Sequence, residues 1–232
     1  MNVLYEDNHI IVVNKQSGEI VQGDKTGDIP LSDIIKTYLK EKYNKPGNVY
    51  LGVVHRLDRP VTGVVLFAKT SKALPRLNKM FAEHEKVKKT YWALVGKTDE
   101  GKCRLECDGE WHTLTHWMTR NEKNNTAKAY DREVPNSKKA ILRYRFIGQS
   151  DRYNLIEIEL QTGRHHQIRC QLSKMGCPIK GDLKYGAPRS NPDGSISLHA
   201  RKLELEHPVT HEYLSITAPV PQDVLWRALC QD

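Results

Sequence analysis

Short stretches in which apolar and polar residues alternate recur along most of the chain. A period of two is typical of strands that bury one face. These stretches are not separated by helices in the regular order that a parallel sheet requires. The sequence therefore predicts an α+β fold with a mixed, largely antiparallel sheet and flanking helices. The expected strands cover residues 2–5, 9–13, 64–68, 90–95, 141–147, 154–160, 198–205 and 213–217.

Two segments have apolar residues at helical spacing instead. The first covers residues 31–39. The second covers residues 74–81, follows Thr70-Ser71 and places Pro75 in its first turn, where proline is tolerated.

The chain has 232 residues, which is long enough for a substantial core. It contains no internal repeat, and we expect one domain over residues 1–232, as a monomer. No stretch approaches the roughly 20 apolar residues that cross a bilayer. The first residues carry acids before a short apolar run, unlike a signal peptide. A cytoplasmic location without membrane contact is therefore expected.

Five cysteines are scattered along the chain, an odd number that favours reduced thiols over a disulfide framework. Thiolates and imidazoles are the usual zinc ligands, so we considered Cys103, Cys107, His112 and His116 as a metal site. Only four residues separate Cys107 from His112, too few for the connecting elements of a zinc finger. No metal site is predicted.

The net charge of +8 and the pI near 9.2 suggest an anionic partner. Residues 119–145 contain eight Lys or Arg and three acids, an excess of five. Neutralising phosphates is one interpretation of this excess, and a solvated loop surface is the other. Within it, residues 121–136 are polar and poor in apolar periodicity, which predicts a mobile connection or hairpin.

The segment His55-Arg56-Leu57-Asp58 follows a largely apolar run and precedes a turn with Pro60 and Gly63. On an extended segment Arg56 and Asp58 would share one face, and His55 and Leu57 the other. Asp58 would then lie near the end of an element, where sites are usually built. Taken alone, an arginine and an aspartate at this spacing are more typical of a surface salt bridge than of a reaction site.

The stretch HRLDRPVTGVVLFAKT (residues 55–70) resembles the signature of RNA pseudouridine synthases of the RluA family, within the RluA/RsuA superfamily. Residues 3–18, 88–96 and 160–186 are similar to the family's other blocks, in the expected order. The chain departs from the family where Lys15-Gln16-Ser17-Gly18 replaces Lys-Pro-Ser-Gly, and where Val61-Thr62-Gly63 replaces Thr-Ser-Gly.

The resemblance implies one sheet with a central catalytic cleft and isomerisation of uridine to pseudouridine in structured RNA. It gives Asp58 the role of the essential carboxylate. Because burial alone would raise the pKa of this carboxyl, a fixed cation is needed beside it, and Arg169 of the family's HQ-x-R block is the candidate. Arg169 is expected on a helix ended by Gly176 and Pro178. Tyr91 matches the tyrosine that packs on the target base.

The target uridine must leave its stack, which costs roughly a few kcal/mol. The resemblance makes Arg56 the candidate for the RNA wedge or a phosphate contact, and leaves His55 a structural role. Arg164 precedes Arg169 by five residues, which on a helix would point the two in different directions. The expected RNA contacts are Arg56, Lys89, Arg164 and His166.

The expected partner is RNA, as a stem-loop of rRNA or tRNA, and the isomerisation requires neither cofactor nor metal. The family's optional N-terminal RNA-binding module of the S4 type has no room ahead of Val3, so the chain resembles a bare catalytic domain.

Three other functions were considered. A kinase is disfavoured because Leu57 interrupts the His-Arg-Asp triplet and no glycine-rich phosphate loop is present. A zinc deaminase lacks its His-x-Glu and Pro-Cys-x-x-Cys pair. The third alternative is a non-catalytic RNA-binding protein or RNA chaperone that keeps the synthase fold. Retention of Asp58, Tyr91 and Arg169 argues against it, since a pure binder needs no buried carboxylate facing phosphates.

Overall fold

The computed structural model describes residues 1–83, 86–97 and 103–230, and the chain divides into two compact units. Unit 1 contains residues 1–88 and 200–219, and unit 2 contains residues 89–199 and 220–232. Each unit is therefore assembled from segments that are distant in the sequence. A single catalytic domain over residues 1–232 stays a prediction.

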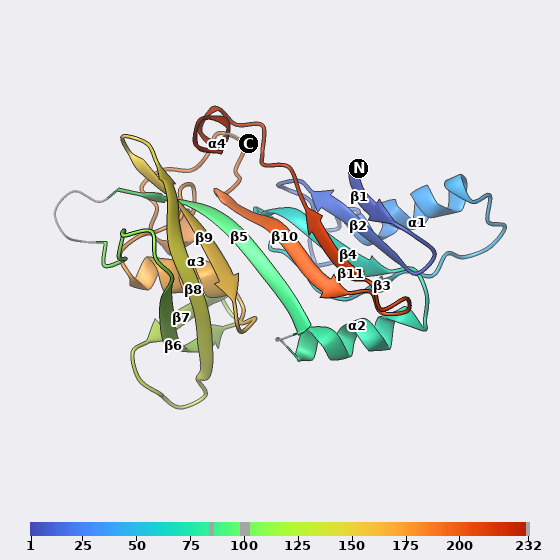
Figure 1. Ribbon diagram of the computed structural model, residues 1–232, viewed down its shortest axis with the longest axis horizontal. Helices are drawn as coiled ribbons and strands as arrows, with labels where there is room; N and C mark the ends of the chain where they lie inside the picture. Colours follow the sequence, from blue (N-terminus) through green and yellow to red (C-terminus); the bar gives the residue numbers. More distant parts are fainter. Residues whose placement is uncertain (84–85, 98–102, 231–232) are drawn as a thin grey trace. The chain divides into compact units, whose positions relative to one another are not determined.

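Unit 1 is built on antiparallel strand pairs, β1–β2, β2–β4, β3–β4 and β10–β11 (Figure 1). Its strand order is β1-β2-β4-β10, with β3 also paired to β4 and β11 to β10. Its elements are β1 (Val3–Glu6), β2 (Ile10–Lys15), α1 (Leu31–Lys42), β3 (Gly52–Val53), β4 (Thr62–Ala68), α2 (Ala73–Ala82), most of β10 (Leu198–Glu206) and β11 (Tyr213–Thr217).

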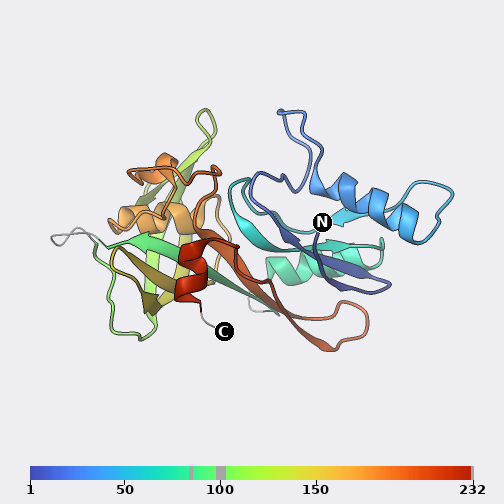
Figure 2. The ribbon, with the colours of Figure 1, turned by 90° about the horizontal axis from the view of Figure 1, so that it is seen from above.

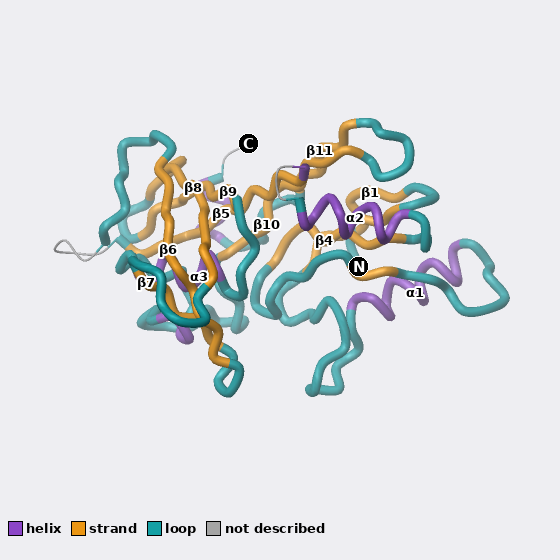
Figure 3. The backbone as a smooth tube through the Cα atoms, turned by 90° about the horizontal axis from the view of Figure 1, so that it is seen from below, coloured by secondary structure: helices purple, strands orange, loops and turns teal. Residues whose placement is uncertain are grey.

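Every residue of β2 and β4 is buried, as expected for strands covered on both faces. One side of this core is an apolar cluster to which α2 contributes Ala73 and Leu77, and β10 contributes Leu203 and Leu205. Both helices predicted from apolar spacing are confirmed, with Pro75 in the first turn of α2. Long loops precede and follow α1, over residues 16–30 and 43–51 (Figure 3).

Unit 2 has the strand order β5-β9-β8-β6-β7. The pairs β5–β9, β8–β9, β6–β8 and β6–β7 are antiparallel. The helices α3 and α4 lie on opposite faces of these strands (Figure 2). The elements are most of β5 (Val87–Gly96), β6 (His112–Asn121), β7 (Thr126–Tyr130), β8 (Lys138–Gln149), β9 (Tyr153–Leu160), α3 (Gln167–Lys174), the 3-10 helix η2 (Leu183–Tyr185) and α4 (Val224–Leu229).

Residues 121–136 contain the β6–β7 hairpin and the connection to β8, which confirms the predicted hairpin. The strand β6 itself was missed by the sequence analysis. Its inward positions are Leu114, His116 and Met118. His116, in the middle of these three, interrupts the apolar alternation in the sequence. Its burial is tolerated because its Nδ1 is hydrogen-bonded to Nε2 of Gln171 at 2.9 Å.

The predicted fold class is confirmed: the sheet is largely antiparallel and the helices flank it. The central cleft stays a prediction. None of the helices in the described ranges is both long enough and apolar enough to cross a membrane.

Glu6, at the end of β1, is the centre of an ionic cluster in unit 1. Its carboxylate accepts hydrogen bonds from Lys42 at 2.7 Å, Lys69 at 2.8 Å, Tyr38 at 3.0 Å and Tyr43 at 2.7 Å. Burial on its own would raise the pKa of Glu6, but these four donors outweigh it and lower the pKa to about 2. The cluster therefore links β1 to α1 and to the end of β4.

We expect Glu6→Gln to lower the free energy of unfolding at pH 7 by about 1–3 kcal/mol, because the ammonium groups lose their carboxylate. The folded pKa is depressed, so this contribution is present above the unfolded pKa near 4.5 and is lost as the pH falls toward about 2. Urea unfolding of the wild type and of Glu6→Gln at pH 7 and pH 3 measures this difference in the free energy of unfolding. The control is Asp33→Asn, which breaks an exposed pair with Lys36 and should change stability by less than about 0.5 kcal/mol. A pH-independent difference would contradict this assignment.

Candidate active site

Asp58 lies in unit 1, in the loop between β3 and β4. Its carbonyl oxygen accepts the Val61 N–H at 3.0 Å, which closes a turn through Arg59 and Pro60. The next residue, Thr62, begins the fully buried strand β4. Asp58 therefore lies four residues before a buried strand, which agrees with its predicted position near the end of an element.

The segment at residues 55–58 is not paired as a continuation of the strand, because β3 ends at Val53. The physical reason is the imidazole of His55. Its Nε2 accepts the N–H of Leu66 on β4 at 3.0 Å, so a side chain takes the donor that a longer β3 could have used. The ring also stacks on Phe81, with the centroids 4.8 Å apart, which fits the structural role expected for His55.

Burial distinguishes the two central residues of this segment. Leu57 is buried, whereas Arg56 is exposed. The guanidinium of Arg56 therefore lies on the surface of unit 1, as its predicted contact with RNA requires.

Lys15, at the end of β2, fixes the loop that carries Asp58. The side chain is 0 % exposed, and its ammonium donates to the carbonyl oxygens of Gln16 at 3.0 Å, Arg59 at 3.0 Å and Val61 at 2.8 Å. Burial lowers the pKa of Lys15 to about 8, although the carboxylates of Glu19 and Asp58 oppose the shift. The sequence analysis noted Lys15 within a motif but gave it no role.

Arg169 lies on α3 in unit 2 and is buried. Its Nε and Nη2 donate to the two carboxylate oxygens of Asp182 at 2.7 and 2.8 Å. Asp182 is only 1 % exposed, so the bidentate pair balances a charge that would otherwise be costly to bury. The helix ends before Gly176, which has φ +79°, as predicted.

Tyr185 connects this ion pair to the start of α3. The guanidinium carbon of Arg169 lies 5.1 Å from the centre of the Tyr185 ring. The Tyr185 hydroxyl accepts the Ala127 N–H at 2.8 Å and is hydrogen-bonded to Nδ1 of His166 at 2.8 Å. Burial raises the pKa of Tyr185 to about 12, so the hydroxyl stays protonated. The sequence analysis did not single out Tyr185 or Asp182.

His166 is buried at the N-terminus of α3 with φ 51°, and stacks on His165 with centroids 3.8 Å apart. This burial suits a positioning role, and its direct contact with RNA stays a prediction. Arg164 precedes the helix, so the expectation that it shares a helix with Arg169 is wrong. The side chain of Gln167 accepts the Arg164 N–H at 2.9 Å, and Arg164 Nε donates to the Lys139 carbonyl at 2.9 Å.

Tyr91 lies on β5 opposite Ile158, and both are buried. Lys89 is two residues earlier on β5 and shares its face. Burial lowers the pKa of the Lys89 amine. Tyr91 and Arg169 belong to unit 2 and Asp58 to unit 1. Their assembly into one reaction site is therefore part of the proposal below.

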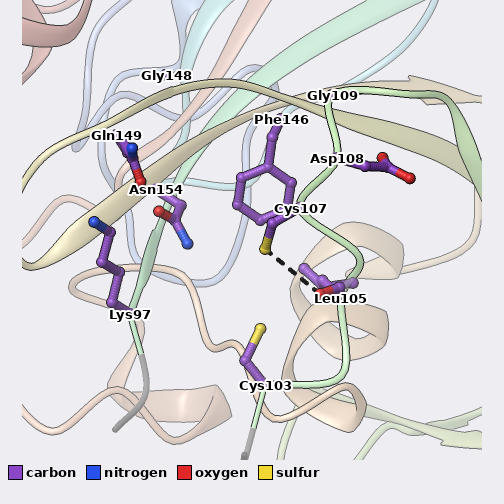
Figure 4. A pocket seen from close by; sticks show the side chains of 10 residues that line it. All are labelled: Lys97, Cys103, Leu105, Cys107, Asp108, Gly109, Phe146, Gly148, Gln149 and Asn154. Atoms are coloured by element: carbon purple, nitrogen blue, oxygen red, sulfur yellow. Dashed lines mark hydrogen bonds between the residues drawn. The ribbon is translucent and has the colours of Figure 1, made fainter.

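A separate pocket of about 620 Å³ lies at the C-terminal end of β8. Figure 4 shows the side chains that line it. The prediction of reduced thiols is wrong for Cys103, which lines this pocket and forms a disulfide with Cys177, 74 residues away. It is confirmed for Cys107 and Cys170, whose thiols are free. The four residues considered for zinc do not come together as a ligand set, because Cys103 is in the disulfide and His116 contacts Gln171. The pocket is lined by Lys97, Cys103, Leu105, Cys107, Asp108, Gly109, Phe146, Gly148, Gln149 and Asn154.

Comparison with known proteins identifies relatives over most of the chain. Residues 9–174 match the family model described as RNA pseudouridylate synthase. An uncharacterized RNA pseudouridine synthase of Bacillus subtilis, YhcT, is 30 % identical over 100 % of this chain and 72 % of its own length. A ribosomal large subunit pseudouridine synthase C of Vibrio parahaemolyticus is 30 % identical over 94 % of this chain and 65 % of its own length.

A solved structure shows the same fold. Human RNA pseudouridylate synthase domain containing 4 has a TM-score of 0.75 at 23 % identity, covering 95 % of this chain and 89 % of that one.

We expect Lys15→Met to loosen the turn that carries Asp58, because three carbonyl oxygens lose the hydrogen bond from the Lys15 ammonium. Hydrogen exchange followed by mass spectrometry should show faster exchange in the peptide over residues 57–63, by about tenfold or more. The control is Lys36→Met on α1, which removes an exposed ammonium and should leave that peptide unchanged. Unchanged exchange in Lys15→Met would contradict the anchoring role.

We expect Asp182→Ala to cost about 3–5 kcal/mol of stability, because the guanidinium of Arg169 is left buried without its carboxylate. The double variant Arg169→Met with Asp182→Leu removes both charges and should be more stable than Asp182→Ala. Urea unfolding of both variants and the parent chain measures this difference. If the double variant were the less stable one, the burial argument would fail.

Proposed function

Because the chain belongs to the RNA pseudouridylate synthase family, we propose that it converts uridine to pseudouridine in structured RNA. The observation that carries the proposal is the Asp58 loop. It lies within the matched residues 9–174, and Lys15 and the start of β4 hold its backbone. A carboxylate held rigidly can act on the same atoms of substrate in every turnover.

The reaction breaks the bond between uracil N1 and the sugar, rotates the base and rejoins it through C5. In our proposal Asp58 supplies the carboxylate that stabilises or bonds to the substrate while the glycosidic bond is broken. We assign Arg169 the role of the cation that keeps this carboxylate ionised during the reaction. The bidentate contact with Asp182 supports this role, because it holds the guanidinium plane in one orientation.

Tyr91 packs on the target base in this proposal, with Lys89 on the same face of β5. The exposed Arg56 contacts the RNA from which the uridine has been extruded. Arg164 and His166 add RNA contacts near the start of α3. The isomerisation is redox-neutral, and no cofactor or metal is needed.

The proposed substrate class is rRNA or tRNA. The Vibrio parahaemolyticus relative is named for the ribosomal large subunit, and the chain covers 65 % of that relative, so its substrate need not be shared. The net charge of +8 supports an RNA partner of either kind. A monomer working in the cytoplasm is part of the same proposal.

Asp58→Asn should abolish isomerisation, because the amide is neutral and a poor nucleophile. The measurement is tritium release from RNA labelled at uridine C5, on separate rRNA and tRNA fractions from cells lacking the gene. Wild type should release tritium and Asp58→Asn should lose at least about 10³-fold in rate, with RNA affinity similar or slightly higher. The control Asp33→Asn makes the same change at an exposed position and should keep full activity.

Equal loss of activity and RNA binding in Asp58→Asn would indicate a misfolded loop and undermine the assignment. Tight RNA binding by the wild type without tritium release from either fraction would favour the non-catalytic RNA-binding protein.

A further inference from the structure

The strands of unit 2 present an open face on the side away from α3. The helix α3 packs on one face, where Gln171 lies against the Leu114 and Ala140 positions. On the opposite face α4 lies over β5, β9 and the end of β8 (Figure 2). There Trp226 packs with Leu94 and Leu155, and Ile147 packs against them. We call the remainder the outer face, formed by residues Trp111, Thr113, Thr115, Trp117, Lys128, Tyr130, Lys139, Ile141, Arg143 and Arg145.

One end of the outer face is a stack of two arginines on a tryptophan. The guanidinium carbons of Arg143 and Arg145 lie 4.5 and 4.8 Å from the centre of the Trp111 ring. Glu159 and Glu157 fix the guanidinium planes, accepting from their Nε atoms at 2.6 and 3.0 Å. The side chains of Arg143 and Arg145 remain 39 % and 41 % exposed.

The other end is a row of two aromatic rings and a lysine. The strand register places Trp117 of β6 opposite Lys139 of β8 on one side and Tyr130 of β7 on the other. Lys128 extends over the Tyr130 ring, 5.2 Å from its centre. Trp117 is six positions after Trp111 along the chain, so the two ends are about 20 Å apart. Exposed Thr113 and Thr115 lie between them.

We propose that the outer face binds a single-stranded segment of RNA, whose bases stack on Trp117, Tyr130 and the Trp111 cluster. The phosphates contact the cations between the rings, Lys128, Lys139, Arg143 and Arg145. This rests on the proposed function, since the segment would flank the modified uridine in the same RNA. It adds a binding surface to the proposed reaction site.

Charge and side-chain type favour RNA over a protein partner. Along these strands the outer face carries four cations, and the two carboxylates beside it, Glu157 and Glu159, are turned to arginines. Flat rings interleaved with cations are the arrangement that binds single strands without reading their sequence. A protein interface would instead need an apolar centre, and Ile141 is the one aliphatic side chain in the set.

The outer face also continues toward a residue expected to contact RNA. Arg164 Nε donates to the Lys139 carbonyl at 2.9 Å, so it lies at the same end as Trp117. At the opposite end, the acidic side chains of Glu106, Asp108 and Glu110 precede Trp111. An RNA strand would therefore run from the Trp111 end toward Arg164 and away from these acids.

The test uses a labelled 12-nucleotide oligoadenylate, which contains no uridine and so reports binding without the reaction. Fluorescence anisotropy should show about tenfold weaker binding for Trp117→Leu with Lys139→Gln, because one base loses its stacking partner and one phosphate its cation. Arg143→Gln with Glu159→Gln leaves the net charge unchanged and should weaken binding about fivefold. The matched control is Asp33→Asn with Lys36→Gln, another neutralised ion pair, which should stay within about twofold.

Two further readouts keep a folding defect separate from a binding defect. Unfolding midpoints identify variants that fail to fold. Ultraviolet crosslinking of the oligoadenylate to the unmodified protein should give adducts in peptides spanning residues 111–130 and 138–145. Crosslinks found only elsewhere, or unchanged affinity in both folded double variants, would overturn the proposal.

The outcomes also separate this proposal from the proposed function. Suppose that the variants lose oligoadenylate binding and that the wild type releases no tritium. This result would support RNA binding by the outer face and contradict the proposed isomerase activity. Tritium release with a raised KM and an unchanged kcat in the Trp117→Leu, Lys139→Gln variant supports both. Tritium release by this variant with an unchanged KM and an unchanged affinity for oligoadenylate would support the isomerase activity and contradict RNA binding by the outer face.

Discussion

The buried ammonium of Lys15 holds together the part of unit 1 on which the proposed chemistry depends. A charged group with 0 % exposure is stable only when its three N–H donors are satisfied, and here backbone carbonyls accept all three. Two of these carbonyls, Arg59 and Val61, flank Pro60. One side chain at the end of β2 thereby sets the path of the chain between Asp58 and β4.

Unit 2 also contains a buried cation whose donors are satisfied, but here the acceptor is a carboxylate. Arg169 is buried and would be mobile among several rotamers without a partner, and Asp182 fixes it through two parallel hydrogen bonds. Tyr185 then ties this pair to His166 and to β7. Both charged groups that the proposed reaction needs are thus positioned by contacts that were not predicted. Lys15 lies 44 and 46 residues from the carbonyl groups of Arg59 and Val61, and Asp182 lies 13 residues after Arg169.

Local patterns predicted local structure well. The helices α1 and α2 followed from apolar spacing, and the end of α3 from Gly176, whose backbone takes the positive φ that glycine tolerates best. Prediction failed at two histidines, where a polar side chain takes the place of a backbone acceptor or of a buried apolar residue. His55 ends β3 by taking a β4 donor, and His116 occupies an inward position of β6. The Cys103–Cys177 disulfide was missed because pairing over 74 residues depends on tertiary proximity.

The division of unit 1 between two stretches of sequence has a consequence for biosynthesis. Its apolar core combines residues of β2, β4 and α2 with Leu203 and Leu205 of β10 and Ile216 of β11. A ribosome makes the first stretch long before the last, at about 5–20 residues per second. The apolar surface that β10 and β11 cover therefore stays exposed on the N-terminal strands until residues 89–199 have been translated. A nascent chain stalled in that interval would present a natural site for a chaperone.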